Sequence, residues 1–202
     1  MLKTHEMIMD ELKGYASPHA RLTRMLKSGT LVQLRRGLFV DNPARLPADN
    51  MAVSRRGIAA ALYGPSYISF QYALAAAGLI PDRVSVLTSA TYNKNKDKLF
   101  RTPLGEFRYL YLPAAVYPYG ITMEEEDGMS YLIATPEKAL CDMVYKTPTV
   151  TTLTGINALL LEDWRMDRDE LVKLDREFIQ RIAPQYHKKS LAALAAWFAK
   201  EA

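Results

Sequence analysis

One proline and three glycines set the local structure of residues 13–40, a stretch with six basic residues and no acidic one. Ser17 and Pro18 predict the start of a helix, because serine caps helices and proline needs no partner for its nitrogen at the first helical position. Gly29 predicts the end, since glycine tolerates the left-handed backbone that follows a helix. The apolar side of this helix comprises Leu22, Met25 and Leu26.

A β-hairpin is predicted directly after the basic helix. Residues 31–34 and 38–40 are mostly apolar, and Arg35-Arg36-Gly37 separates them at a length that suits a tight connection. Gly37 permits the positive φ that such a connection often needs. Two arginines are therefore expected at the tip of a small hairpin.

A shorter helix is expected ahead of the basic one. Residues 4–13 place Met7, Ile8 and Leu12 at helical spacing, and Gly14 can end that helix. Helix, basic helix and hairpin form the layout of a winged helix-turn-helix. In that fold the basic helix enters the major groove of DNA, and the wing touches the backbone or the minor groove.

The charge distribution favours DNA as the partner. The first 45 residues hold eight basic and four acidic residues, whereas the other 157 hold eighteen of each. A local positive field on a compact unit attracts a duplex phosphate backbone, although a solvated helix face is the alternative for any basic helix. The strongest predicted DNA contacts are Arg21, Arg24, Lys27, Arg35 and Arg36. The second rank comprises Ser17, His19 and Thr23.

The composition also bounds the location of the protein. Cys141 is the single cysteine and cannot form an internal disulfide, which fits a reducing compartment. There is no run of 18 uncharged apolar residues, and the charged N-terminus lacks the apolar core of a signal peptide. We therefore expect a cytoplasmic protein with no membrane partner.

The rest of the chain predicts a mixed α/β domain, so the expected fold class is α/β (α+β) with a helical C-terminal end. Residues 45–50 form a polar linker, which suggests a DNA-binding domain over 1–45 and a second domain over 46–202. Arg55 and Arg56 could extend the basic surface. Strands are expected at 84–88 and 107–112, with weaker candidates at 117–121 and 129–133. Helices are expected at 51–63, 72–78, 153–161, 169–182 and 188–199, and after Thr135-Pro136.

Nothing in the sequence favours catalysis. Glu106, residues 124–127 and Glu137-Lys138 offer the acids and lysine that a metal-dependent nuclease needs. The acidic run is typical of a solvated turn. Glu137 and Lys138 are typical of the first turn of a helix, and Cys141 is typical of a small core residue. No P-loop, dinucleotide fingerprint or HExxH motif occurs. We expect no enzyme, cofactor or metal, and a nuclease is the most distant alternative.

Residues 92–101 (YNKNKDKLFR) form a further basic stretch. Three lysines and Arg101 accompany one acid, and Tyr92 and Phe100 lie at its edges. An exposed loop is the first interpretation, and a second nucleic-acid contact is the alternative.

Three segments together resemble the AbiEi-type antitoxins of bacterial type IV toxin–antitoxin systems. Residues 15–40 resemble the N-terminal module of that family. Residues 67–81 (YISFQYALAAAGLIP) are similar to its SYxSxxxALxxxGLI segment, and residues 133–145 (IATPEKALCDMVY) to its AxPEKALxDxxY segment. The resemblance covers most of the chain, and the order and spacing of the three segments carry it.

The resemblance implies a winged-helix DNA-binding domain followed by an α/β antitoxin domain. Such proteins bind repeats in their own promoter, repress their operon, and oppose a nucleotidyltransferase-like toxin without a stable toxin complex. Little chain precedes the first helix, so one helix of a three-helix module is missing or shifted. Two alternatives stay open: a protein-interaction module whose basic patch only steers a partner, and a solitary transcriptional regulator without a toxin.

Overall fold

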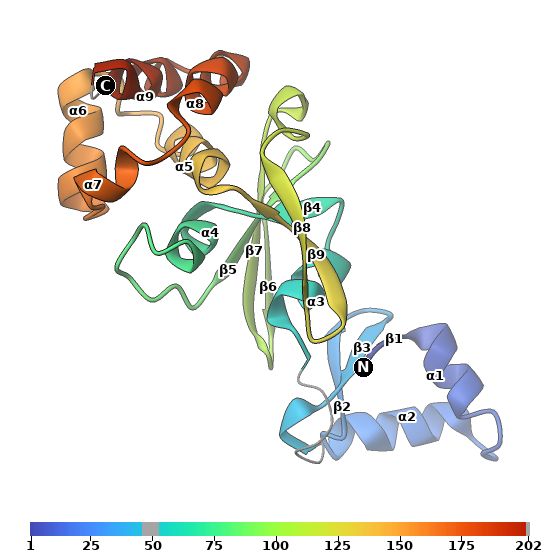
Figure 1. Ribbon diagram of the computed structural model, residues 1–202. Coiled ribbons are helices and arrows are strands. Elements are labelled where there is room, and N and C mark those ends of the chain that lie inside the picture. Colours follow the sequence, from blue (N-terminus) through green and yellow to red (C-terminus); the bar gives the residue numbers. More distant parts are fainter. Residues whose placement is uncertain (46–52, 201–202) are drawn as a thin grey trace.

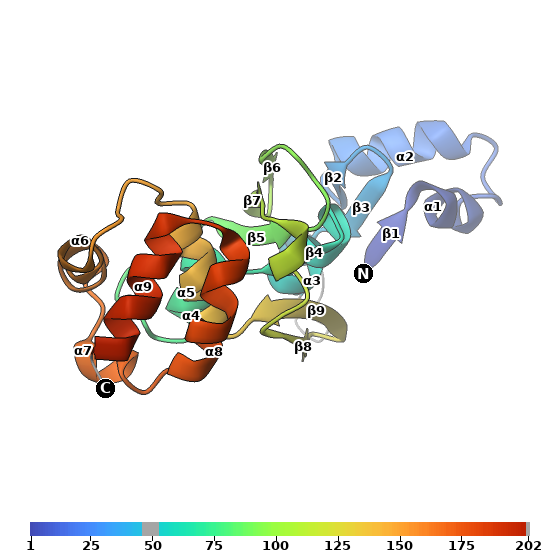
Figure 2. The same cartoon turned by 90° about the horizontal axis from the view of Figure 1, so that it is seen from above.

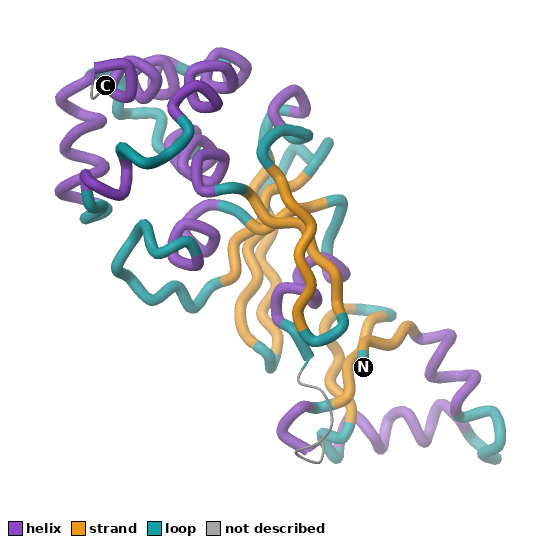
Figure 3. The backbone as a smooth tube through the Cα atoms, viewed as in Figure 1, coloured by secondary structure: helices purple, strands orange, loops and turns teal. Residues whose placement is uncertain are grey.

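The structure is a computed structural model that describes residues 1–45 and 53–200. Three parts follow one another along the molecule in two perpendicular views (Figures 1 and 2): a small N-terminal unit, a central sheet and a group of C-terminal helices. Figure 3 shows strands in the first two parts and helices alone at the C-terminal end. The described chain is therefore mixed α/β, which confirms the expected fold class at that level.

The N-terminal unit has two helices and a three-stranded sheet. Its elements are β1 (Leu2–Thr4), α1 (His5–Glu11), α2 (Pro18–Lys27), β2 (Leu31–Arg35) and β3 (Leu38–Asp41), followed by a 3₁₀ turn, Pro43–Arg45. The strands pair antiparallel in the order β1-β3-β2. The helices and the hairpin lie where the sequence predicts them, whereas β1 was not expected.

Local signals explain the two helices. The Thr4 hydroxyl accepts a hydrogen bond from the Met7 N–H at 3.3 Å and caps α1. Pro18 occupies the first turn of α2 behind Ser17, whose side chain makes no cap hydrogen bond. Gly29 has a φ of +70° and ends the helix in the left-handed conformation.

The β2–β3 hairpin is covered on both faces. Leu31 and Phe39 pack in a small core with Ile8 of α1, Leu12 directly after α1, and Leu22 of α2. The alternating residues join the large core of the rest of the protein: Val32, Leu34, Leu38 and Val40. The hairpin therefore belongs to two cores at once. The boundary between residues 45 and 46 stays a prediction, and linker residues 46–50 lie outside the described ranges.

The large sheet is mixed and open. Its strands are β4 (Ser66–Ile68), β5 (Leu87–Thr91), β6 (Lys98–Thr102), β7 (Gly105–Tyr111), β8 (Ile121–Glu126) and β9 (Met129–Ala134). Their order is β6-β7-β5-β4-β9-β8, with β5–β7 and β4–β9 parallel and the other pairs antiparallel. Strands β6 and β8 are the edges, and β6 contacts β2 of the N-terminal unit.

Helices pack around this sheet and at its C-terminal side. Those near the sheet are α3 (Arg55–Leu62), α4 (Phe70–Ala76) and α5 (Pro136–Tyr145), and those at the end are α6 (Leu153–Ala158), α7 (Arg168–Leu171), α8 (Arg176–Ile182) and α9 (Lys189–Lys200). α4 packs on β5 and α5, and α9 contacts α5, α6 and α8. No helix in the described part of the chain is long and apolar enough to cross a membrane.

Several strands differ from the sequence-based expectation. β5 begins three residues later than the strand predicted at 84–88. The strand candidate at 117–121 is wrong, since β8 begins only at Ile121. Residues 92–101 include the first part of β6, and the acidic residues 124–126 lie in β8, so only Asp127 and Gly128 form the turn. The two strands with basic or acidic runs, β6 and β8, are edge strands, which tolerate charged side chains because one side faces solvent.

The helices also differ in their ends. The helix predicted at 51–63 spans Arg55–Leu62, and residues 51 and 52 lie outside the described ranges. The helix at 153–161 becomes α6 followed by a π-helical turn, Leu159–Asp163. Residues 169–182 form two helices, α7 and α8, in place of one.

Candidate nucleic-acid interface

The basic helix α2 buries one side and exposes the other. Leu22 is buried in the small core, whereas His19, Arg24 and Lys27 are exposed. The Arg24 Nε donates to the Ala20 carbonyl oxygen at 3.4 Å, one turn earlier in the same helix. Arg24 and Lys27 lie in the last turn, where cations interact favourably with the negative end of the helix dipole.

Three other predicted contacts of α2 are partly engaged. The His19 ring stacks on His5 with ring centres 5.9 Å apart, and the Thr23 hydroxyl donates to the His19 carbonyl at 3.0 Å. Arg21 is half-buried, with its guanidinium 5.2 Å from the centre of the Tyr15 ring. These contacts hold the side chains of His19, Thr23 and Arg21 in place. The Arg21 Nε is buried and has no hydrogen-bond partner among the described residues.

The acids of the N-terminal unit do not neutralise α2. Glu11 and Asp41 pair with Lys3 at 2.9 and 3.4 Å, and Asp41 also binds the terminal amine. Asp10 pairs with Lys13 at 2.9 Å. Three of the four acids in this unit are thus engaged elsewhere. Within residues 1–45 and 53–200, no carboxylate makes an ion pair with the predicted DNA-contacting cations: Arg21, Arg24, Lys27, Arg35 and Arg36.

The hairpin arginines form a second group at the far end of β2. Arg35 and Arg36 are exposed, and Arg35 donates from Nη1 to the Arg36 carbonyl at 3.4 Å. Gly37 has a φ of +78°, and its carbonyl accepts from the His5 N–H at 3.1 Å. Five residues of strand span about 16 Å, so the structure brings the predicted residues together in two groups and not in one cluster. The tip points toward the large sheet (Figure 1).

Arg55 and Arg56 extend the basic surface less than expected. Arg56 donates to the Tyr131 hydroxyl at 3.0 Å and lies 3.7 Å from the Glu126 carboxylate. Arg55 donates to the Ser85 carbonyl at 2.9 Å. Both side chains are half-buried, so their charge serves contacts within the protein.

A buried polar cluster centred on Asp142 was missed by the sequence analysis. Lys138 and Asp142 are completely buried on α5, and the ammonium lies 2.6 Å from the carboxylate. Tyr67 and Ser69 donate to the other carboxylate oxygen at 2.9 and 2.7 Å. Tyr186 donates to the same oxygen as Lys138. A lysine and an aspartate four residues apart in an otherwise apolar helix were the available signal.

This cluster joins the two later segments of the family resemblance. Tyr67 and Ser69 come from residues 67–81, and Lys138 and Asp142 from residues 133–145. Burial raises the pKa of Tyr67 and Tyr186 well above the ordinary tyrosine value, and the negative charge of Asp142 adds to the rise. Both phenols therefore stay protonated and act as hydrogen-bond donors.

The acids weighed for a nuclease lie apart. Glu106 is on β7 and pairs with Arg101 at 2.8 Å, whereas Glu124 is on β8 at the other side of the sheet. Glu137 accepts from the Asp175 N–H at 3.1 Å. Cys141 is buried, and burial raises the pKa of its thiol. Among the described residues, no three His, Cys, Asp or Glu side chains group as metal ligands would.

Comparison with known proteins establishes the fold alone. No protein-family model matches the chain, and no curated protein matches it. The chain is similar to the crystal structure of the RV2827C protein from Mycobacterium tuberculosis, with a TM-score of 0.51 and 14% sequence identity. The match covers 99% of this chain and 76% of that one. The two chains thus share an overall mixed α/β arrangement.

Proposed function

We propose that the protein is a regulator that binds duplex DNA through its N-terminal unit. The observation that carries this proposal is the set of exposed cations on α2 and at the hairpin tip, which have no ion-pair partner among the described residues. Uncompensated positive charge on a compact unit is the electrostatic signature of phosphate binding. On this proposal the protein works in the cytoplasm and needs neither catalysis nor a cofactor.

The topology of the unit supports a winged helix. A strand precedes two helices and a hairpin, and the three strands pair in the order β1-β3-β2. In such a module α2 would be the recognition helix and the β2–β3 hairpin the wing. Arg24 and Lys27 would approach the groove from the helix, and Arg35 and Arg36 would contact phosphates from the wing.

The wider role is proposed from the resemblance to AbiEi-type antitoxins. The protein would repress its own operon and oppose a nucleotidyltransferase-like toxin. The Asp142 cluster supports the resemblance, because residues of both later segments meet there. A solitary regulator without a toxin, or a protein-interaction module, is the alternative.

A gel-shift assay on the DNA upstream of the protein's own reading frame tests the DNA proposal. Arg24→Ala/Arg35→Ala/Arg36→Ala should weaken binding and lower the slope of log K against log salt by roughly 3, about 0.9 for each lost phosphate contact. The matched control, Lys173→Ala/Lys188→Ala/Lys189→Ala, removes the same charge from the C-terminal helices and should bind like the wild type.

Two outcomes would count against the proposal. Equal binding by the wild type and the arginine variant rules out this surface as the contact. If the wild type does not bind its upstream DNA, the interaction module becomes the better account. Co-expression with an adjacent nucleotidyltransferase-like gene, where one exists, separates antitoxin from solitary regulator, because only an antitoxin restores growth.

A further inference from the structure

A group of lysines and aromatic rings lies at the β6 edge of the large sheet. Lys94 and Lys98 place their ammonium groups 5.5 and 5.4 Å from the centre of the Tyr63 ring, and Lys98 lies 5.8 Å from the centre of Phe100. Tyr63 and Phe100 are themselves 5.8 Å apart. The β6 patch is defined here as Lys94, Lys98, Tyr63 and Phe100.

The charge of this patch is available to a ligand. Lys98 is exposed and Lys94 half-exposed, and no carboxylate in the described ranges forms an ion pair with either. Asp97 lies between them in the sequence but turns away: its carboxylate pairs with Lys146 at 3.2 Å and accepts from the Tyr111 N–H at 3.0 Å. Cation–π contact with the rings holds the ammonium groups in place without neutralising them.

The strand that carries Lys98 and Phe100 contacts the hairpin of the N-terminal unit. Lys98 is paired with Tyr109 across β6 and β7, and β6 contacts β2. The Tyr109 ring also lies 5.3 Å from Tyr63. The strand that ends at Arg35 thus contacts the strand that carries Lys98.

We propose that the β6 patch is a second phosphate-binding surface, which continues the DNA contact of the N-terminal unit onto the edge of the large sheet. The inference rests on the proposed function, since the ligand is the same duplex. Positive charge continues from α2 to the hairpin tip and then to β6. β2 alone spans about 16 Å, close to half of a helical turn of DNA of roughly 34 Å, so the patch would meet phosphates beyond the wing.

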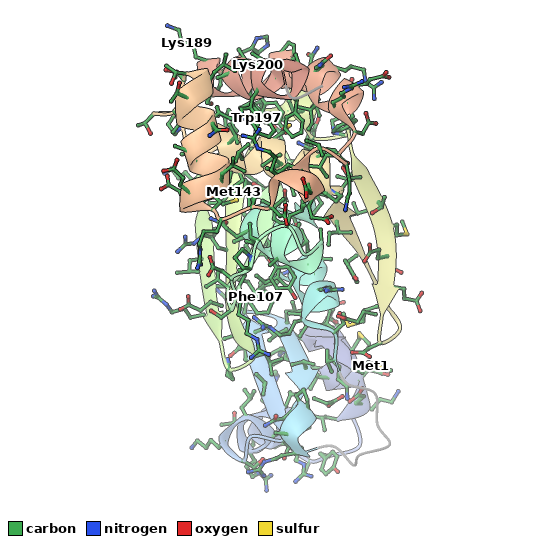
Figure 4. The ribbon with its side chains drawn as sticks, turned by 60° about the vertical axis from the view of Figure 1, so that its left-hand side comes forward. Met1, Phe107, Met143, Lys189, Trp197 and Lys200 are labelled. Atoms are coloured by element: carbon green, nitrogen blue, oxygen red, sulfur yellow. The ribbon has the colours of Figure 1, made fainter. Side chains whose placement is uncertain are left out.

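The test uses the full-length protein and the same upstream DNA. Lys94→Gln/Lys98→Gln should lower the slope of log K against log salt by about 2, and hydroxyl-radical footprinting should lose protection at one end of the site only. The control Lys188→Gln/Lys189→Gln removes the same charge at the opposite end of the molecule. Figure 4 shows Lys189 at the top of the molecule, Phe107 of the sheet further down, and Met1 of the N-terminal unit lower still.

The outcomes separate this inference from the proposed function. If the lysine variant keeps the salt slope and footprint of the wild type, the β6 patch does not touch DNA and the N-terminal contact stands. If Lys94→Gln/Lys98→Gln and Lys188→Gln/Lys189→Gln reduce the slope equally, the change reflects the total charge of the protein, and the inference fails. If the wild type does not bind the duplex, both proposals fall together.

Discussion

Asp142 accepts more buried hydrogen bonds than its position in an apolar helix would suggest. Its two oxygens bind one ammonium and three hydroxyl groups, which come from β4, the start of α4, α5 and the chain before α9. A buried charge is tolerated only when it is paired and its hydrogen bonds are made. The cluster therefore ties the C-terminal helices to the sheet through one carboxylate.

Lys138→Met should be strongly destabilising. The change leaves the Asp142 carboxylate buried without its counter-charge, which typically costs about 3–5 kcal/mol. Urea unfolding measures the loss. The control Lys146→Met breaks the partly exposed pair with Asp97 and should cost less than about 1 kcal/mol. Equal effects of the two changes would contradict a central role for the cluster.

Alkaline pH should weaken the protein through the same residues. Free tyrosine has a pKa of about 10, and the pKa values of Tyr67 and Tyr186 are raised in the folded state. Above about pH 10 the unfolded chain loses these protons while the folded chain keeps them. The stabilisation is therefore complete below that pH and falls as pH rises further. Urea midpoints across this range should decline less steeply for Tyr186→Phe, and parallel declines would argue against the assignment.

Among the helices and strands, the sequence predicts those whose ends are set by residues within one turn. Pro18, Gly29 and Gly37 locate α2 and the hairpin because each acts within a turn. β1 could not be predicted in this way, since its three residues become a strand only by pairing with β3, about 36 residues later. Lys98–Thr102 resembles a loop in composition and forms β6 because β7 lies beside it.

The candidate sites follow the same rule. The exposed cations of α2 were identified from local pattern and charge. The sequence predicts Lys138 only as a first-turn helix residue, because one of its partners, Tyr186, is 48 residues away. Burial of a charge depends on tertiary contacts that the spacing within α5 cannot specify.

The helix caps give a test at this scale. The Asp175 carboxylate accepts from the Phe178 N–H at 2.9 Å at the start of α8, whereas the Ser17 side chain makes no such bond at α2. Asp175→Ala should therefore cost about 1 kcal/mol in urea unfolding, and Ser17→Ala no more than a few tenths. A large loss for Ser17→Ala would mean that its hydroxyl caps α2 and is not free for a phosphate.

In the complete molecule, the boundary drawn by charge does not coincide with the boundary drawn by packing. Positive charge is concentrated in the first 45 residues, but the hairpin of that segment packs into the core of the remainder. A displacement of α2 can therefore reach the large sheet through the packed side chains of β2 and β3.

Residues 1–45 expressed alone should not form a stable fold. The fragment would expose the apolar side of its hairpin, including Leu34 and Val40, and domains of this size are marginal even with a complete core. We expect poor amide dispersion in its NMR spectrum, whereas the full-length protein should give dispersed peaks. A well-dispersed spectrum of the fragment would show that the small core suffices.

Because the β2–β3 hairpin is covered on both faces, it also limits which N-terminal segments could replace residues 1–45. Leu31 and Val32 are neighbours in the chain but face different cores, so a slip of one residue would exchange the two sets of side chains. In a chimera that takes its first 45 residues from a relative, the hairpin side chains of one protein would have to pack in the core of another. Recombination between related chains should therefore succeed only when the outer face of the hairpin and the surface it packs on are inherited together.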